Sequence, residues 1–304
     1  MTRVCVVGAG VIGSLYAGHL AQVGEVSVLT RREGHAEALN AEGLHVSGKS
    51  ERQAAVSATR DPAALPDVDL CIVATKATHL EAAAQALEGR LPGATIMTVQ
   101  NGLGAEEIVR AHGDWPLISA VTFMSGTKHA DTHVEYILDT ETWLGPYEST
   151  PRESVDETAQ LLASSGLKAR AFDNLRPAQW SKLIFNATVN SVAALTGLPH
   201  DRHFAETARP DDLGRVVREL MEEGTRVAAA AAIELHEDPW DMNIHATQHG
   251  SAHYPSMLED VQVRRPTEID LITGSLVREA DRLGVDVPQH RALYALVKGI
   301  EESW

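Results

Sequence analysis

The first thirty residues contain the feature that most restricts how this chain can fold. Val4 to Val7 is a short apolar, β-branched run of the kind that forms a buried parallel strand. The turn Gly8-Ala9-Gly10-Val11-Ile12-Gly13 follows at once, and Ser14 to Val23 has a helical pattern. Val26 to Leu29 then suits a second strand. The order of strand, GxGxxG, helix and strand is typical of a dinucleotide-binding unit.

The residues of this turn have distinct expected roles. Gly8 permits the tight turn, Gly10 lets the backbone approach a pyrophosphate, and Gly13 lets the helix pack close to the sheet. The helix N-terminus offers unpaired N–H groups and a partial positive charge to the phosphates. We therefore predict cofactor contacts along the whole turn, including Ala9, Val11 and Ile12. A glycine-rich turn without a ligand is the alternative.

The end of the second predicted strand indicates which dinucleotide is bound. A cofactor without a 2′-phosphate usually meets Asp or Glu there, but this strand ends in Thr30-Arg31-Arg32 and the first acid is Glu33. Guanidinium groups can bind a phosphate bidentately, which favours NADPH over NADH. Arg31 lies nearest the strand end and is the first candidate. Under the alternative reading, one or both arginines are solvated surface charges.

Composition narrows the class of protein and its partners. The 304 residues suffice for two domains, and 44% hydrophobic with 22% charged residues is ordinary for a soluble globular chain. The net charge of −16 argues against nucleic acid or an anionic membrane as partner, and no apolar run has the length of a membrane span. An anionic substrate would then need a locally positive site. A homodimer is kept as a candidate assembly, and no residue of the sequence fixes the oligomeric state.

Two further observations concern the cellular setting. The first strand begins at the initiator end, so we expect no signal or transit peptide. Cys5 and Cys71 both fall in predicted buried strands and are interpreted as small core residues rather than a disulfide framework. A reducing, cytoplasmic location fits both observations.

The order of predicted elements indicates an α/β protein with two domains. The first part alternates strands and helices, and after Asp173 only helices are expected. We predict a Rossmann-type dinucleotide-binding domain over 1–173 and an all-helical domain over 174–304. Further strands are predicted at Asp69–Thr75, Thr95–Val99, Ile118–Phe123 and Ala169–Phe172, with Val134–Leu138 and Thr142–Leu144 as an antiparallel pair; helices are predicted at Pro151–Ser165 and near 176–196, 210–233, 238–248, 267–283 and 289–302.

A polar stripe interrupts the most apolar of the predicted helices. Lys182, Asn186 and Asn190 are spaced i, i+4, i+8 in WSKLIFNATVNSVAALTG, which puts them on one face. Buried polar groups without partners cost several kilocalories, so a docked polar ligand would explain the stripe. An amphipathic helix whose polar edge meets water explains it equally well from these residues alone.

Two loop residues follow predicted strands at positions where ligands bind in open α/β sheets. Lys76 follows the strand ending at Thr75, and Asn101 follows the strand ending at Val99. Asn101 offers a donor and an acceptor that suit a carboxamide or a hydroxyl. The alternatives are a solvated charge for Lys76 and an ordinary Asn-Gly turn for Asn101.

Two other groups of residues have competing interpretations. Pro266 and Thr267 resemble a helix start, where Glu268 and Asp270 would simply favour the helix dipole; alternatively, one of these acids faces Lys182. His245, His249 and His253 are spaced i, i+4, i+8, as in some zinc sites. No acid or cysteine completes an obvious ligand set, so we predict no metal site.

The ordered set of motifs resembles the ketopantoate reductase (2-dehydropantoate 2-reductase) family along the whole chain. The motifs are GAGVIG, Thr-Lys-Ala after a strand, Gln-Asn-Gly, W-x-K-L-x-x-N-x-x-x-N, P-S-M-L-x-D and R-x-T-E-I-D. The resemblance implies a Rossmann-type domain and a helical domain. It also implies NADPH-dependent reduction of a small anionic 2-oxo acid, 2-dehydropantoate, to (R)-pantoate on the route to pantothenate and coenzyme A.

The resemblance also implies roles for individual residues. Lys182 would be the proton donor and Glu268 a catalytic carboxylate that also bonds cofactor or substrate. The implied substrate contacts are Asn186, Asn190, Ser256 and Asn101, and the implied cofactor contacts include Asn101, Lys76, Gly126 and Glu268. The chain departs from the family pattern at Ser191, where a proline is common, and at Leu198-Pro199-His200, where some members carry a further asparagine. These departures bear on substrate identity.

The chemistry of keto reduction agrees with this assignment. Negative charge grows on the oxygen of the keto group, and a lysine ammonium can stabilise the charge and supply the proton. Burial would lower the pKa of Lys182 and a nearby Glu268 would raise it, and the sequence leaves both possible. Two rivals remain: a reductase of another 2-oxo acid or an imine, and a non-catalytic NADPH sensor.

Overall fold

The buried apolar runs of the first half of the chain form one eight-stranded sheet in a computed structural model, which describes residues 1–205, 211–249 and 254–304. The strand order is β12-β11-β8-β7-β6-β1-β2-β5. All neighbours are parallel except β11, which runs antiparallel to β8. The strands are β1 (Thr2–Val7), β2 (Gly24–Leu29), β5 (Ser57–Thr59), β6 (Leu70–Val73), β7 (Thr95–Thr98), β8 (Leu117–Thr122), β11 (Thr142–Pro146) and β12 (Ala169–Ala171).

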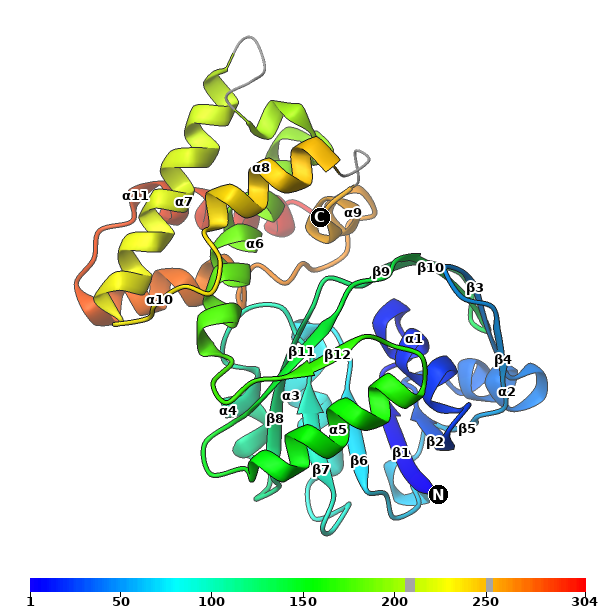
Figure 1. Ribbon diagram of the computed structural model, residues 1–304. Helices are drawn as coiled ribbons and strands as arrows, with labels where there is room; N and C mark the ends of the chain where they lie inside the picture. The colour runs from blue at the N-terminus through cyan, green and yellow to red at the C-terminus, as the bar shows by residue number, and fades with distance from the viewer. Residues whose placement is uncertain (206–210, 250–253) are drawn as a thin grey trace. The chain divides into compact units, whose positions relative to one another are not determined.

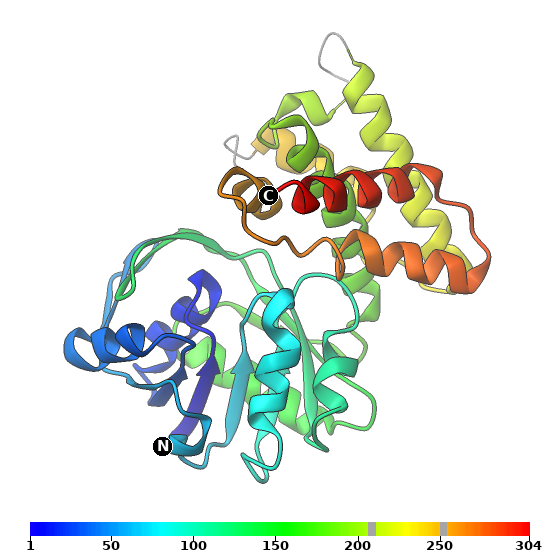
Figure 2. The ribbon, with the colours of Figure 1, turned by 180° about the vertical axis from the view of Figure 1, so that it is seen from behind.

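Helices cover both faces of this sheet, and Figures 1 and 2 show α3 and α5 on opposite sides of it. Side chains of α1 and α5, such as Leu15, Tyr16 and Leu162, share one buried core with the strands. The helices are α1 (Val11–Leu20), α2 (Glu33–Glu42), α3 (Leu80–Leu87), α4 (Ala105–Arg110) and α5 (Arg152–Ser164), with short 3₁₀ turns η1 (Pro62–Ala64) and η2 (Ala77–His79). A parallel sheet with helices on both faces confirms the predicted Rossmann-type class.

A second, four-stranded sheet has the order β4-β3-β10-β9, with β3 (Leu44–Gly48), β4 (Arg52–Ala54), β9 (Ser125–Ala130) and β10 (His133–Leu138). It corrects the predicted antiparallel pair of Val134–Leu138 with Thr142–Leu144. The first segment pairs with β9 and β3, and the second pairs with β8 and β12. The error arose because β9, Ser-Gly-Thr-Lys-His-Ala, is polar and mostly exposed, so it carries no apolar alternation.

The C-terminal part is helical, as predicted. Helix α6 (Arg176–Thr196) contacts each of the other α-helices there. Close packing is visible at Gly224 of α7, where a Cβ would lie 2.6 Å from Ile184 Cγ2. The other elements are η3 (Arg202–Phe204), α7 (Asp212–Ala230), α8 (Pro239–His249), α9 (Ser256–Gln262), α10 (Thr273–Leu283) and α11 (Pro288–Glu302). In the described parts of the chain, no helix combines the length and apolar character that a membrane span requires.

Two details of the helical part differ from the sequence-based expectation. The predicted helix start at Pro266-Thr267 is wrong, because α10 begins at Thr273. Residues 268–272 instead form a bend and a turn, in which the N–H groups of Leu271 and Ile272 donate to Glu268 O. Glu268 therefore does not occupy the first turn of a helix, which removes the dipole as the reason for its presence. Helix α9 was not predicted as a helix, since seven residues are too few for a clear period.

The chain divides into two compact units by its internal contacts. Unit 1 comprises Met1–Gln100 and Ala105–Leu175, and unit 2 comprises Asn101–Gly104 and Arg176–Trp304. The short segment in unit 2 packs on the turn before α10, where Leu103 N donates to Leu271 O at 3.1 Å. Gly102 has φ +95°, and a Cβ there would lie 1.6 Å from Leu271 O, so only glycine fits. This approach fixes the neighbouring Asn101.

Candidate functional site

The glycine turn of unit 1 has a different constraint at each glycine. Gly8 has φ +100°, and a Cβ there would lie 3.0 Å from Thr75 N. A Cβ on Gly13 would lie 1.9 Å from Gly8 O, so this glycine permits the close approach of α1 to the strand end. A Cβ on Gly10 would meet nothing within 4 Å. Gly10 is also the N-cap of α1 and offers no side-chain cap. The turn thus leaves open space beside the N–H groups of a helix N-terminus, which suits an anionic group.

Strand β9 packs against the same turn through residues of one face. A Cβ on Gly126 would lie 3.1 Å from Val11 Cγ1. Two residues further on, Lys128 Nζ donates a hydrogen bond to Ala9 O at 2.8 Å. Lys128 was not among the predicted residues, because a lysine in a polar strand gives no local signal of a partner more than a hundred positions away.

The ends of β2 and β6 place basic side chains in unit 1. Arg31 is exposed. The positive charges of Arg31 and Lys76 both act electrostatically on the imidazole of His79. Burial, followed by these two charges, lowers the pKa of His79. Gln100 Nε2 donates to Val73 O and Thr75 O at 2.8 and 3.0 Å, which ties the loop after β7 to the end of β6. His79 is a further neighbour of the predicted cofactor residues that the sequence did not indicate.

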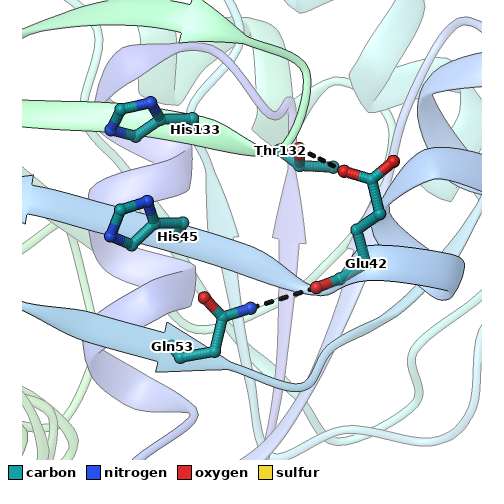
Figure 3. A pocket seen from close by; sticks show the side chains of 5 residues that line it. All are labelled: Glu42, His45, Gln53, Thr132 and His133. Atoms are coloured by element: carbon teal, nitrogen blue, oxygen red, sulfur yellow. Dashed lines mark hydrogen bonds between the residues drawn. The ribbon is translucent and has the colours of Figure 1, made fainter.

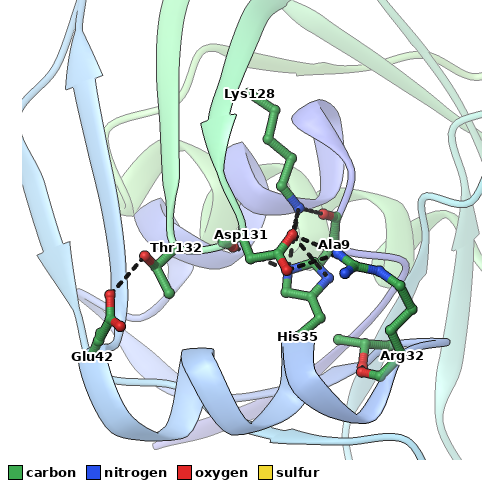
Figure 4. Close-up of polar contacts among 8 residues, drawn as sticks. Ala9, Arg32, His35, Glu42, Lys128, Asp131 and Thr132 are labelled. Atoms are coloured by element: carbon green, nitrogen blue, oxygen red, sulfur yellow. Dashed lines mark hydrogen bonds and ion pairs between the residues drawn. The ribbon is translucent and has the colours of Figure 1, made fainter.

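Arg32 is held by an acid instead (Figure 4). Its Nη2 donates to Asp131 Oδ1 and Oδ2 at 2.6 and 2.7 Å. Within residues 1–205, 211–249 and 254–304, Arg31 forms no ion pair. The two arginines therefore have different surroundings, although they are consecutive in the sequence and nothing in the sequence distinguishes them.

The polar stripe of unit 2 lies on a helix that is buried nearly all round. Lys182, Asn186 and Asn190 on α6 are only 8%, 8% and 6% exposed. Large neighbours such as Trp180 and Ile184 are fully buried. An edge of α6 that meets water is thus excluded as the explanation of the stripe.

Residues far apart in the sequence meet beside this stripe. Asn101 Nδ2 donates to Glu268 Oε2 at 3.2 Å, and Asn186 Nδ2 donates to Asn101 Oδ1 at 3.4 Å. The negative charge of Glu268 also acts on Lys182. Unit 2 therefore gathers the buried Lys182 and Asn186 with the half-buried Asn101 and Glu268 into one polar cluster.

Asn190 and Ser256 are brought together at the start of α9. Asn190 Oδ1 accepts a hydrogen bond from Met257 N at 3.4 Å. Ser256, the preceding residue, is the first of α9 and is exposed. The stripe thus leads from the buried Lys182 to a hydroxyl that solvent reaches.

The electrostatic state of Lys182 follows from its burial. Burial lowers its pKa to about 8, and the charge of Glu268 opposes this effect. An ammonium with a pKa near neutrality transfers its proton more readily than an ordinary surface lysine does. The cluster therefore combines an acid of suitable strength with amide groups that can donate and accept hydrogen bonds.

A pocket of about 280 Å³ lies on the second sheet of unit 1 (Figure 3). It is lined by Glu42, His45, Gln53, Thr132 and His133, none of which is a predicted site residue. The rings of His45 and His133 are stacked with centroids 4.6 Å apart. Across the described ranges, no group of three His, Cys, Asp or Glu side chains is arranged to hold a metal ion. Of the spaced histidines, His253 and the side chain of His249 lie outside the described residues.

Comparison with known proteins gives one family. The sequence matches the family described as "Ketopantoate reductase PanE/ApbA" over residues 4–149 and its C-terminal domain, "Ketopantoate reductase PanE/ApbA C terminal", over residues 174–301. A protein of Pyrococcus abyssi named 2-dehydropantoate 2-reductase is 28% identical over 98% of each chain. One of Streptococcus pyogenes with the same name is 29% identical, covering 98% of this chain and 97% of its own.

Solved structures agree with this result. The PanE/ApbA family ketopantoate reductase from Ralstonia eutropha is 30% identical, with a TM-score of 0.89 over 99% of both chains. A D-mandelate dehydrogenase solved with NADH and anilino(oxo)acetate is 25% identical, with a TM-score of 0.88 over 99% of both chains. Together, the two matched segments and these relatives establish that the chain belongs to the ketopantoate reductase family, as its motifs predicted.

Proposed function

We propose that this protein reduces 2-dehydropantoate to (R)-pantoate with NADPH, a step toward pantothenate and coenzyme A. The observation that carries the proposal is the polar cluster of unit 2, in which a buried lysine with a pKa near 8 lies in the field of Glu268 and beside two asparagines. The names of the relatives support the reaction class. A net charge of −16 makes a buried cation especially valuable for an anionic substrate.

The proposed cofactor contacts begin with the glycine turn, Gly8, Ala9, Gly10, Val11, Ile12 and Gly13, and include Arg31, Lys76, Asn101, Gly126 and Glu268. The open space at Gly10 and the uncapped start of α1 fit a pyrophosphate. Arg31, without an ion pair in the described ranges, fits a 2′-phosphate. When bound, NADPH supplies the hydride.

In the proposed reaction, Lys182 holds the keto oxygen and gives it a proton as negative charge develops there. Asn186 and Asn190 orient the keto and hydroxyl groups through hydrogen bonds, and Ser256 binds the carboxylate. Asn101 holds Glu268 through a hydrogen bond, and the charge of Glu268 keeps Lys182 protonated at neutral pH.

A second candidate is the reduction of another 2-oxo acid. It is favoured by the likeness to a D-mandelate dehydrogenase. Mandelate is an aromatic 2-hydroxy acid, and its oxidation at the hydroxyl carbon gives an aromatic 2-oxo acid. That structure contains NADH, so the choice of NADPH is also part of the proposal. The departures at Ser191 and Leu198-Pro199-His200 lie on or just after α6.

The test is a matrix of substrates and cofactors. The purified protein is assayed for NADPH and NADH oxidation with ketopantoate, phenylglyoxylate, pyruvate and a cyclic imine. We expect the highest kcat/KM with ketopantoate and NADPH. A clear preference for phenylglyoxylate would establish the second candidate. Tight NADPH binding without turnover of any compound would indicate a sensor and contradict both.

A further inference from the structure

A four-residue ionic cluster links the glycine turn of unit 1 to the end of β2 (Figure 4). Asp131, in the turn between β9 and β10, accepts both hydrogen bonds from Arg32. Its main-chain oxygen lies 3.0 Å from His35 Nε2. Lys128 Nζ lies 3.5 Å from Asp131 Oδ1 and donates to Ala9 O. The carboxylate therefore contacts Arg32 after the end of β2 and also Lys128, which is bonded to the glycine turn.

Asp131 is well held in this position. Its side chain is 30% exposed, whereas the Arg32 side chain is 65% exposed. Burial alone would raise the pKa of Asp131, but Arg32, His35 and Lys128 together lower it. The backbone of Arg32 is fixed as well, because Thr30 Oγ1 donates to Arg32 O at 3.0 Å. The guanidinium of Arg32 is thus engaged before any ligand arrives.

We propose that Asp131 is a specificity-determining residue, which holds Arg32 in an ion pair and leaves Arg31 as the arginine available to a 2′-phosphate. This inference rests on the proposed use of NADPH. A phosphate that approached Arg32 would have to displace a carboxylate that already accepts two short hydrogen bonds from it. With Asp131 present, Arg31 alone binds the 2′-phosphate, so the preference for NADPH over NADH is smaller than two arginines would give.

The ratio of the two dissociation constants isolates this effect. Asp131 also lies near Lys128 and the glycine turn, so its replacement changes the local potential that both cofactors experience at their common pyrophosphate. That shared change cancels in the ratio of Kd for NADH to Kd for NADPH. The ratio then reports what the 2′-phosphate alone experiences, and the double variant with Arg32→Gln separates a contact with Arg32 from the loss of the Asp131 charge.

The experiment measures both constants by quenching of tryptophan fluorescence in the full-length protein. Asp131→Asn should raise the ratio about two- to fivefold, the worth of one additional solvent-exposed ionic contact. Arg32→Gln alone should leave the ratio unchanged within about twofold, because that guanidinium is already occupied. The double variant Asp131→Asn/Arg32→Gln should return to the ratio of Arg32→Gln, and Asp131→Glu should keep the ratio of the parent.

Asp69→Asn is the matched control, since it removes the same charge from an exposed pair with Arg3 at the opposite end of β1 from the glycine turn. Its ratio should not change. An unchanged or lowered ratio in Asp131→Asn overturns the inference, as does a large fall in Arg32→Gln. Arg31→Ala separates a failure of this inference from a failure of the proposed NADPH preference: if Arg31→Ala does not lower the ratio either, the NADPH preference itself is wrong.

Discussion

Asn101 donates its side-chain N–H to Glu268 Oε2 across 3.2 Å, although 167 positions separate the two residues. The contact depends on Gly102, whose lack of a side chain lets the loop after β7 approach Leu271 O. Asn186 donates to the same asparagine, so one amide joins α6 to the turn before α10. The side chain of the acid that influences the buried lysine therefore accepts a hydrogen bond from a distant loop.

Replacement of Lys182 tests the proton donor. Lys182→Ala should lower kcat about 10²- to 10⁴-fold, the usual worth of a positioned general acid. Affinity for NADPH should change little, because most proposed cofactor contacts lie elsewhere. Steady-state kinetics and fluorescence titration measure the two quantities. Lys49→Ala, which removes an exposed lysine, is the control, and a Lys182→Ala variant with most of its activity would remove this residue from the mechanism.

The pH dependence of kcat should report the ionisation of Lys182. Because its pKa is about 8, the rate should fall as the pH rises above that value and the ammonium loses its proton. Glu268 raises this pKa, so Glu268→Gln should move the alkaline limb of the profile to lower pH. Asp270→Asn, at a neighbouring acid bonded to Tyr294 and Lys298, should leave the limb in place. A limb that moves to higher pH in Glu268→Gln would contradict the assigned interaction.

The burial of Lys182 should also destabilise the fold at neutral pH. The folded state lowers its pKa from 10.5 to about 8, so the unfolded chain binds the proton more tightly and the penalty is complete below about pH 8. Lys182→Met keeps the volume without the charge and should raise the free energy of unfolding by about 1–3 kcal/mol at pH 7. The gain should shrink as the pH rises from about 8, and it should be lost well above pH 10.5, where the lysine is neutral in both states. Urea unfolding at pH 7 and pH 10 tests this, and an equal gain at both would show that packing alone is responsible.

Much of the fold follows from local patterns in the sequence. The run Val4–Val7 lies in β1, and the predicted helix at 176–196 matches α6, because both combine strong apolar character with clear boundaries. Strand β9 was missed because its side chains are polar and face solvent. It forms by pairing with β10, and pairing between strands depends on partners that local propensity does not describe.

In the candidate site, too, local patterns predicted some features, whereas contacts between distant segments could not be predicted. The stripe on α6 could be found because its three members share one helix period. The pairs Asn101–Glu268 and Lys128–Ala9 join segments 167 and 119 positions apart, and no spacing rule connects such residues. The same holds for Arg31 and Arg32, which are alike in sequence and differ only because Asp131 reaches one of them.

Cofactor choice is tested at Arg31. NADPH should be used at least about tenfold more efficiently than NADH, and Arg31→Ala should weaken NADPH selectively by about 1–3 kcal/mol, the worth of a charge-assisted contact. Arg60→Ala removes an exposed arginine of the same unit and is the control. Comparable kcat/KM for the two cofactors in the parent protein would contradict the preference for NADPH.

The outer end of the stripe is tested at Ser256. This hydroxyl is exposed, and the adjacent Met257 N is held by Asn190, so loss of the hydroxyl should leave α9 in place. Ser256→Ala should therefore raise KM for the keto acid about tenfold, as expected for one lost hydrogen bond to a charged carboxylate, with a smaller effect on kcat and on NADPH affinity. Ser303→Ala, at an exposed serine of the same unit, should change none of these constants. A ketone analogue that lacks the carboxylate should bind the parent and Ser256→Ala equally, because neither protein can make this contact with it. If Ser256→Ala instead lowers kcat and leaves KM unchanged, the serine does not bind the ground-state carboxylate, and the substrate must be oriented by Asn186 and Asn190 without it.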